Sequence, residues 1–75
     1  MKDLLETIVK NLVEDVDSIS INEKLEDGTI ILELTVANED VGKVIGKQGK
    51  IAKAIRTVIK AAAAYENKRV VVKIM

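Results

Sequence analysis

The sequence predicts an α+β fold, with the element order α-β-β-α-α-β and a three-stranded mixed sheet packed under three helices. Two observations support this fold class. The spacing of apolar residues changes from helical to alternating and back to helical along the 75 residues. The pair Asp27-Gly28 also stands between two alternating segments. A chain of this length forms one domain, so we expect a single unit over residues 1–75.

The first half of the chain is expected to form one helix and a β-hairpin. An amphipathic helix is predicted from residue 3 to about residue 14, because apolar residues recur there at three- and four-residue intervals. Two strands are predicted within residues 18–36, where apolar and polar residues alternate. Gly28 supplies the positive φ that a tight turn between these strands requires.

The second half is expected to form two helices and a strand. The Asn-Glu-Asp segment at 38–40 favours a helix start by capping, but the glycines that follow keep that helix short. A longer helix is predicted over residues 50–65 and a last strand over 69–74. The connection through two helices is long enough for parallel pairing, with a right-handed crossover. We expect the second strand, which is apolar even at Ile31, at the centre of the sheet.

The composition limits the possible activities. The chain has no His and no Cys, so the usual general base, the thiolate nucleophile, disulfides and thiolate metal sites are all absent. We therefore expect no enzymatic activity, no cofactor and no metal. No apolar run approaches the ~20 residues that span a bilayer, and the acidic-flanked start lacks the basic region of a signal peptide. The expected protein is soluble, unexported and cytoplasmic.

Charge is distributed unevenly although the formal net charge is zero. Residues 1–40 hold three basic and eleven acidic side chains, whereas residues 41–75 hold nine basic and one acidic, so the halves carry −8 and +8. This asymmetry favours contact with nucleic acid or a membrane surface. Pairing of charge between the two halves is the alternative, and charge alone leaves it open.

The most informative segment is Gly46-Lys47-Gln48-Gly49, which lies between two predicted helices. Two glycines three positions apart allow a sharp turn and let another backbone approach closely. Amide groups at the start of the following helix favour a phosphate, and Lys47, Lys50 and Lys53 add positive charge around it. An ordinary glycine-rich turn between helices is the alternative for the tetrapeptide alone.

Two other phosphate-binding motifs fail by spacing. A P-loop counted from Gly42 requires a second glycine where Lys47 stands. A dinucleotide fingerprint requires glycines two positions apart directly after a strand, whereas Gly42 and Gly46 are four apart and a short helix is predicted there.

The sequence around this loop resembles the KH family. That family combines an apolar pair, Gly-x-x-Gly and then apolar positions at helical spacing, and the matching residues here are Val44-Ile45, Gly46 to Gly49, Ala52 and Ile55. The predicted element order is that of the type II KH fold found in bacterial proteins, so the resemblance covers the whole chain. The size and the single domain are most similar to the small bacterial KhpA family.

The resemblance implies a groove for about four nucleotides of single-stranded RNA, with the glycine loop holding their backbone. Apolar residues of the short helix and of the central strand would meet bases, and residues 67–69 would close the other rim. The implied RNA-binding residues are Gly42, Lys43, Ile45, Gly46, Lys47, Gln48, Gly49, Lys50, Lys53, Lys68 and Arg69. With no aromatic residue in the groove, we expect weak and poorly discriminating binding.

The family resemblance also implies partners and a role. We expect a bacterial post-transcriptional regulator or RNA chaperone that forms a homodimer, or a heterodimer with a larger KH-containing protein. The alternative function is a protein–protein interaction module in which the fold mainly supports dimerisation. Acidic residues at the two middle loop positions would favour that alternative, and Lys47 and Gln48 are not acidic.

The long helix is predicted to carry the dimer surface. At 100° per residue, one sector faces the core with Ala52, Ile55, Ile59 and Ala62, and the lysines and arginine occupy another. A third sector is apolar and comprises Ile51, Ala54, Val58, Ala61 and Tyr65. A second copy of the helix could cover it. The alternative, which helical geometry leaves open, is that the N-terminal helix of the same chain covers this sector.

Overall fold

The computed structural model describes all 75 residues and has the element order that the sequence predicts. The chain forms three helices and three strands, and a short 3₁₀ turn follows each of α1, β2 and α2. The elements are α1 (Lys2–Lys10), η1 (Val16–Ser18), β1 (Ser20–Glu26), β2 (Thr29–Thr35), η2 (Asn38–Asp40), α2 (Val41–Ile45), η3 (Lys47–Gly49), α3 (Lys50–Tyr65) and β3 (Arg69–Ile74). None of the helices combines the length and the apolar character needed to cross a bilayer.

The sheet has the order β1-β2-β3, which confirms the prediction of a mixed sheet with the second strand at its centre. β1 pairs antiparallel with β2, and β2 pairs parallel with β3. Asp27 and Gly28 connect β1 to β2 with φ values of 48° and 78°. A two-residue hairpin turn of type I′ requires a positive φ at both of its central residues.

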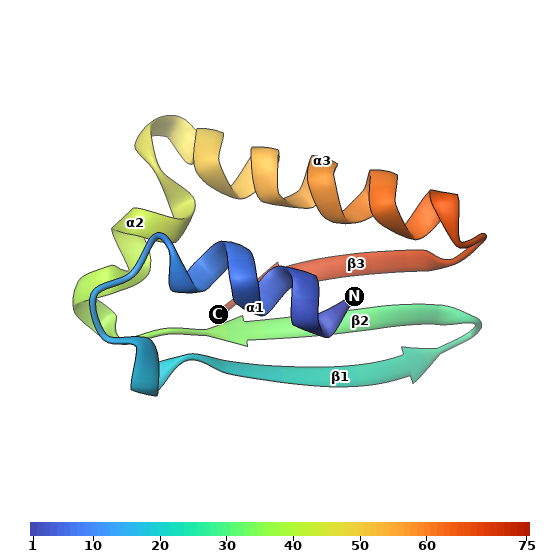
Figure 1. Ribbon diagram of the computed structural model, residues 1–75, viewed down its shortest axis with the longest axis horizontal. Coiled ribbons are helices and arrows are strands. Elements are labelled where there is room, and N and C mark those ends of the chain that lie inside the picture. The colour runs from blue at the N-terminus through green and yellow to red at the C-terminus, as the bar shows by residue number, and fades with distance from the viewer.

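The molecule has two layers. Figure 1 shows α1 and α3 on one face of the sheet, while the other face is bare. Alternation along β2 turns Leu32 and Leu34 toward the helices, where both are fully buried. The buried core cluster comprises Leu5, Val9, Val13, Leu32, Leu34, Val36, Val44, Ile55, Ile59 and Val72.

Two details differ from the sequence-based prediction. α1 ends at Lys10 rather than near residue 14. The N–H groups of Asn11 and Leu12 donate to carbonyl oxygens three positions earlier, which tightens the last turn, and the chain then leaves the helix direction. In α3, Ala63 is buried in the core where Ala62 was predicted, and Ala62 is half-buried. The turn after α1 brings the backbone of residues 14 and 15 close to α2.

Candidate nucleic-acid interface

The glycine loop joins α2 to α3 with an unusual backbone. Gly46 ends α2 with φ 77° and ψ 175°, a region open almost only to glycine. Gln48 (φ 59°, ψ 24°) and Gly49 (φ 75°, ψ 14°) are both left-handed, and Lys50 then begins α3. The change from left-handed backbone at Gly49 to right-handed backbone at Lys50 turns successive N–H groups toward one concave side, which suits an anion.

The three glycines around the loop serve different purposes. A Cβ on Gly46 would lie 2.6 Å from Cγ1 of Ile51, so this glycine is required by packing inside the protein. A Cβ on Gly49 would meet nothing within 4 Å, although its positive φ also favours glycine. Gly42 lies in α2, has neither a positive φ nor a neighbour within 4 Å, and is exposed. Packing within the chain therefore gives no reason for a glycine at position 42.

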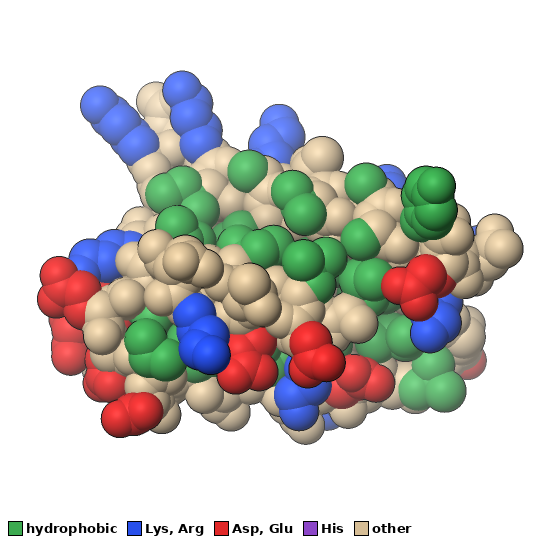
Figure 2. All heavy atoms as spheres, viewed as in Figure 1, with side chains coloured by type: hydrophobic (Ala, Val, Ile, Leu, Met, Phe, Trp, Pro, Cys, Tyr) green, Lys and Arg blue, Asp and Glu red, His purple; other side chains and the backbone are tan.

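The side chains around the loop are exposed and mostly basic. Lys47, Gln48, Lys50 and Lys53 are all exposed, and none of the three lysines pairs with a carboxylate. Ile45, at the end of α2, keeps 37% of its surface exposed. Figure 2 shows basic side chains standing out from the end of the molecule where α2 meets α3, while acidic side chains gather on the opposite, lower part of this face. The loop is therefore a positively charged end of the molecule.

A groove lies farther along α3, where its first lining residue is Arg56. It has a volume of ≈ 560 Å³ and lies between α3 and the edge strand β3. Its lining residues are Arg56, Lys60, Ala64, Lys68, Arg69, Val70, Val71 and Val72. Lys68, on the α3–β3 connection, and Arg69, the first residue of β3, thus lie on this groove at the end of α3 opposite the loop.

The apolar wall of the groove is not the one predicted from the sequence. The central strand was expected to meet the bases, but Leu32 and Leu34 are fully buried beneath the helices. The edge strand supplies the wall instead, through Val70, Val71 and Val72. The physical reason is that a strand paired on both sides and covered by helices has no free apolar surface, whereas β3 has one unpaired edge.

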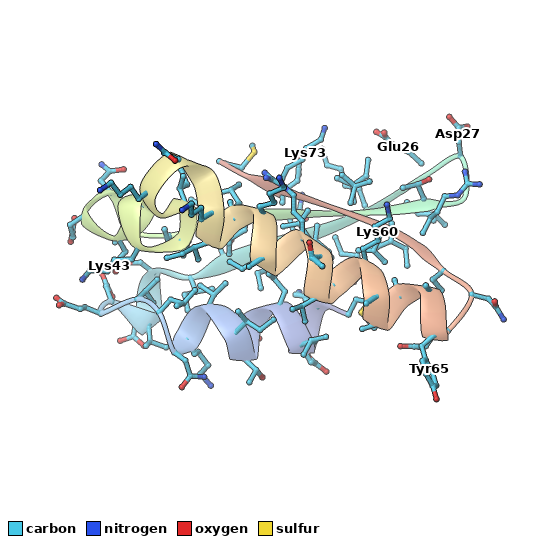
Figure 3. The ribbon with its side chains drawn as sticks, turned by 90° about the horizontal axis from the view of Figure 1, so that it is seen from above. Glu26, Asp27, Lys43, Lys60, Tyr65 and Lys73 are labelled. Carbon is cyan, nitrogen blue, oxygen red and sulfur yellow. The ribbon has the colours of Figure 1, made fainter.

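Lys43, one of the predicted RNA-binding residues, is held by two carboxylates. Its Nζ lies 3.0 Å from Glu14 and 3.3 Å from Asp40. The hydrogen-bonded Glu14 carboxylate is the largest cause that raises the pKa of Lys43, and Asp40 adds to it. Figure 3 shows Lys43 at the α2 end of the molecule, directed away from α3. The positive charge of its ammonium group is therefore already balanced by carboxylates of the same chain.

Asp40 is the buried polar residue of the structure and joins two distant segments. Its carboxylate accepts hydrogen bonds from the N–H groups of Asp15 at 3.0 Å and Glu14 at 3.3 Å. The bond from Asp15 is the largest cause that holds the pKa of Asp40 below its usual value, against the opposing effect of burial. Asp40 does not cap α2 with its side chain, as the sequence had suggested, but fastens the α1–β1 connection to the start of α2.

The third sector of α3 forms an exposed apolar strip on the side opposite the groove. Val58 is 47% and Tyr65 95% exposed, Ala54 and Ala61 are exposed, and Ile51 is half-buried. Ile8 and Leu12 of α1 flank the strip and share with it a hollow of ≈ 390 Å³. α1 thus lies beside this sector rather than over it, and Figure 2 shows the resulting band of apolar side chains between the two helices.

A glycine loop between two helices, within the order α-β-β-α-α-β around a mixed sheet, defines a KH domain of type II. Residues 2–74 match the family model described as "KhpA/KhpB, KH domain". The chain belongs to this KhpA/KhpB family of KH domains, which confirms the resemblance seen in the sequence.

Several proteins named RNA-binding protein KhpA are similar to the chain over its full length. The protein from Clostridium acetobutylicum is 67% identical and that from Clostridium perfringens 61% identical, each over 75 residues that cover all of both chains. The protein from Chlamydia trachomatis is 47% identical over all of this chain and 96% of its own length.

The structure also brings forward residues that the sequence did not assign to the site. Arg56 and Lys60 line the groove, as do the valines of β3. Helical spacing from Lys53 places Arg56 and Lys60 in the basic sector of the predicted helix, and this spacing could have indicated that they belong to the site. Asp40 gave no such signal, because its partners lie 25 and 26 positions earlier in the chain.

Proposed function

We propose that this chain binds single-stranded RNA through the glycine loop and the groove between α3 and β3. The observation that carries the proposal is that the loop and the groove both belong to α3, the loop at its N-terminal end and the groove along its later turns. A positively charged loop with left-handed backbone at Gln48 and Gly49 lies at the N-terminal end of α3, and a basic groove with a valine wall runs along the same helix. The relatives named RNA-binding protein KhpA support it.

The loop would hold the sugar-phosphate backbone. N–H groups at the start of α3 and the unpaired Lys47, Lys50 and Lys53 attract a phosphate, and the open side of Gly49 lets the RNA backbone approach. Bases would then lie over Ile45, Gly42 and the edge strand. The proposed contacts are Gly42, Lys43, Ile45, Gly46, Lys47, Gln48, Gly49, Lys50, Lys53, Lys68 and Arg69, with Lys43 least available because of its two carboxylate partners.

The test is the double substitution Lys47→Asp with Gln48→Asp. Both side chains are exposed, so the fold should persist, while carboxylates at the loop repel phosphate. We expect RNA affinity for a short mixed-sequence pool to fall by at least about 100-fold at low salt, because neutralised phosphates dominate such binding. Fluorescence anisotropy measures the affinity, and circular dichroism confirms the fold.

A matched control changes the net charge equally at a distance from the loop. Lys2→Asp with Ser20→Asp alters two exposed positions, on α1 and β1. We expect at most a small loss of affinity. Equal losses in the two double variants, or undiminished binding by the loop variant, would contradict the proposed site.

We also propose that the chain assembles through the apolar strip, as a homodimer or with a larger KH-containing protein. The observation that favours assembly is the exposure of Val58 and Tyr65 beside Ile8 and Leu12, which α1 leaves uncovered. Exposed alanines at 54 and 61 let a second helix come close. Such a dimer, acting in the cytoplasm, would present two RNA sites, which suits a post-transcriptional regulator or an RNA chaperone.

Val58→Asp tests assembly. A carboxylate at this half-exposed position costs the folded monomer little, but it loses hydration when a partner covers it, so we expect the dimer dissociation constant to rise at least about 100-fold. Sedimentation velocity gives the oligomeric state. Thr57→Asp, one position along α3 and outside the strip, should leave it unchanged. A wild-type chain that remains monomeric at high concentration would disprove homodimerisation through this strip.

A further inference from the structure

The side chains that line the groove share one chemical property. Ala64 and the three valines of β3 are apolar, and the other four residues are Arg56, Lys60, Lys68 and Arg69. Lysine and arginine donate hydrogen bonds but cannot accept them. No side chain that lines the groove therefore offers an acceptor to a bound base, although Lys68 lies 3.8 Å from the carboxylate of Glu66.

Arg56 is the one donor of the groove that the fold holds in place. Its Nε donates a hydrogen bond of 3.2 Å to the carbonyl oxygen of Val72. β3 is an edge strand, so this bond occupies an acceptor of the sheet edge that a base could otherwise have used. The two terminal nitrogens of the guanidinium keep four N–H donors in a rigid plane. Anchored at Nε, this planar group forms a fork whose direction is fixed by α3 and β3 together.

A fork of parallel donors matches a base that has two neighbouring acceptors. Guanine presents O6 and N7 side by side, which is the commonest specific partner of arginine. Cytosine presents O2 and N3 in the same way. Adenine has its amino group next to N1 and N7, and uracil has N3–H between its two carbonyl oxygens. In both bases an N–H donor would therefore face one of the N–H donors of the guanidinium.

We propose that Arg56 is a specificity-determining residue, which selects guanine or cytosine over adenine and uracil at one position of the bound RNA. The proposal rests on the proposed RNA-binding function and deepens it. Lys60, Lys68 and Arg69 attract phosphates of any sequence, whereas the anchored Arg56 reads one base. The domain thus has a single base-selective contact in a groove that otherwise discriminates poorly.

The test uses eight-nucleotide uridine RNAs in which one central position is U, A, G or C. We expect the wild-type chain to bind the G or the C oligonucleotide roughly tenfold more tightly than the A oligonucleotide at fixed salt, as one bidentate contact allows. Arg56→Lys keeps the positive charge but loses the fork, so the four affinities should converge to within about twofold. Lys60→Gln, the matched control, should weaken all four RNAs while the preference persists.

A second measurement needs no altered protein and therefore does not depend on how the Arg56 variant folds. In 7-deazaguanine the N7 acceptor is absent, and in 3-deazacytosine the N3 acceptor is absent. Whichever base the wild-type chain prefers, its deaza analogue should bind no better than adenine. Retention of affinity by that analogue would overturn the proposal.

The outcomes separate this inference from the function on which it rests. Equal binding of all four RNAs by the wild-type chain, or a preference that survives in a folded Arg56→Lys variant, overturns the role of Arg56 and leaves RNA binding intact. The absence of measurable binding to any RNA overturns both. A preference that is lost in Arg56→Lys and kept in Lys60→Gln supports the proposal.

Discussion

The two flanks of α3 differ in chemistry although they belong to one helix. On the flank beside α1, the exposed residues are apolar and include Val58 and Tyr65. On the flank beside β3, Arg56 and Lys60 form the rim of a groove. Figure 3 shows Lys60 and Tyr65 projecting from opposite sides of the helix. The proposed RNA surface and the proposed dimer surface therefore lie on different flanks of α3, and substitutions on one flank should leave the other unaffected.

Gly46 is the position at which the glycine loop and the apolar strip are in contact. Gly46 belongs to the loop proposed to bind RNA, but the space where its side chain would lie is filled by Ile51, at the margin of the apolar strip. Gly49 contacts nothing in that direction. A substitution at Gly46 should therefore affect both flanks, whereas a substitution at Gly49 should affect only the loop.

The largest effect is predicted for Gly46→Ala. The new Cβ would clash with Ile51 and the backbone would be strained, which together cost about 3 kcal/mol or more in the free energy of unfolding. Because Ile51 must move, dimerisation should weaken together with RNA binding. Urea unfolding, sedimentation and anisotropy on one preparation measure all three.

Gly49→Ala is the matched comparison. Its left-handed φ costs an alanine about 1 kcal/mol, and the added Cβ would enter the open space that we propose the RNA backbone occupies. We expect roughly tenfold weaker RNA binding and an unchanged dimer. Equal effects of the two substitutions on dimerisation would show that the loop glycines are equivalent, contrary to the geometry.

An intermediate effect is predicted for Asp40, which fastens the α1 side of the molecule to the helix that leads into the loop. Asp40→Asn replaces one of the two acceptor oxygens by an NH₂ group, so either the N–H of Glu14 or that of Asp15 loses its acceptor. The substitution also removes the charge beside Lys43, so the Tm at pH 7 should fall by roughly 5–10 °C.

The pH dependence identifies the charge as the cause. The pKa of Asp40 is lowered in the folded state, so its contribution to stability is present above the unfolded value of about 3.9 and is lost as the pH falls through the folded value. The Asp40→Asn variant should therefore lose less stability than the wild type between about pH 5 and pH 2. Glu39→Gln, at the exposed neighbouring carboxylate, should preserve the wild-type slope; identical slopes in all three chains would exclude the role of Asp40.

The smallest effect is predicted for Gly42→Ala, which sharpens the contrast between folding and binding. An alanine in a helix is favoured over glycine by about 1 kcal/mol, and the space around Gly42 is open. The variant should be more stable than the wild type and bind RNA a few-fold less tightly. Thermal unfolding and anisotropy measure the two changes, and a gain in both stability and affinity would show that no ligand approaches this helix.

The strands and the glycine loop could be predicted from sequence because their signals are local. Asp27-Gly28 fixes the hairpin, and the Gly46 to Gly49 spacing marks the loop. The Asp40 contact, the early end of α1 and the position of the groove could not, since each depends on segments that meet only after folding. A period of 100° per residue placed Arg56 in a basic sector, but only the edge position of β3 gives that residue a carbonyl to bind.

The parallel pairing of β2 with β3 also bears on how the site forms in time. Thr29 pairs with Arg69, forty positions later, whereas Glu26 and Thr29 of the hairpin are three apart. Local contacts close quickly and distant ones slowly, because a longer loop loses more entropy on closure. We therefore expect the hairpin and the helices to form early and the pairing of β3 with β2 to form late. On this order, the loop proposed to hold phosphate would be present before the proposed groove is complete.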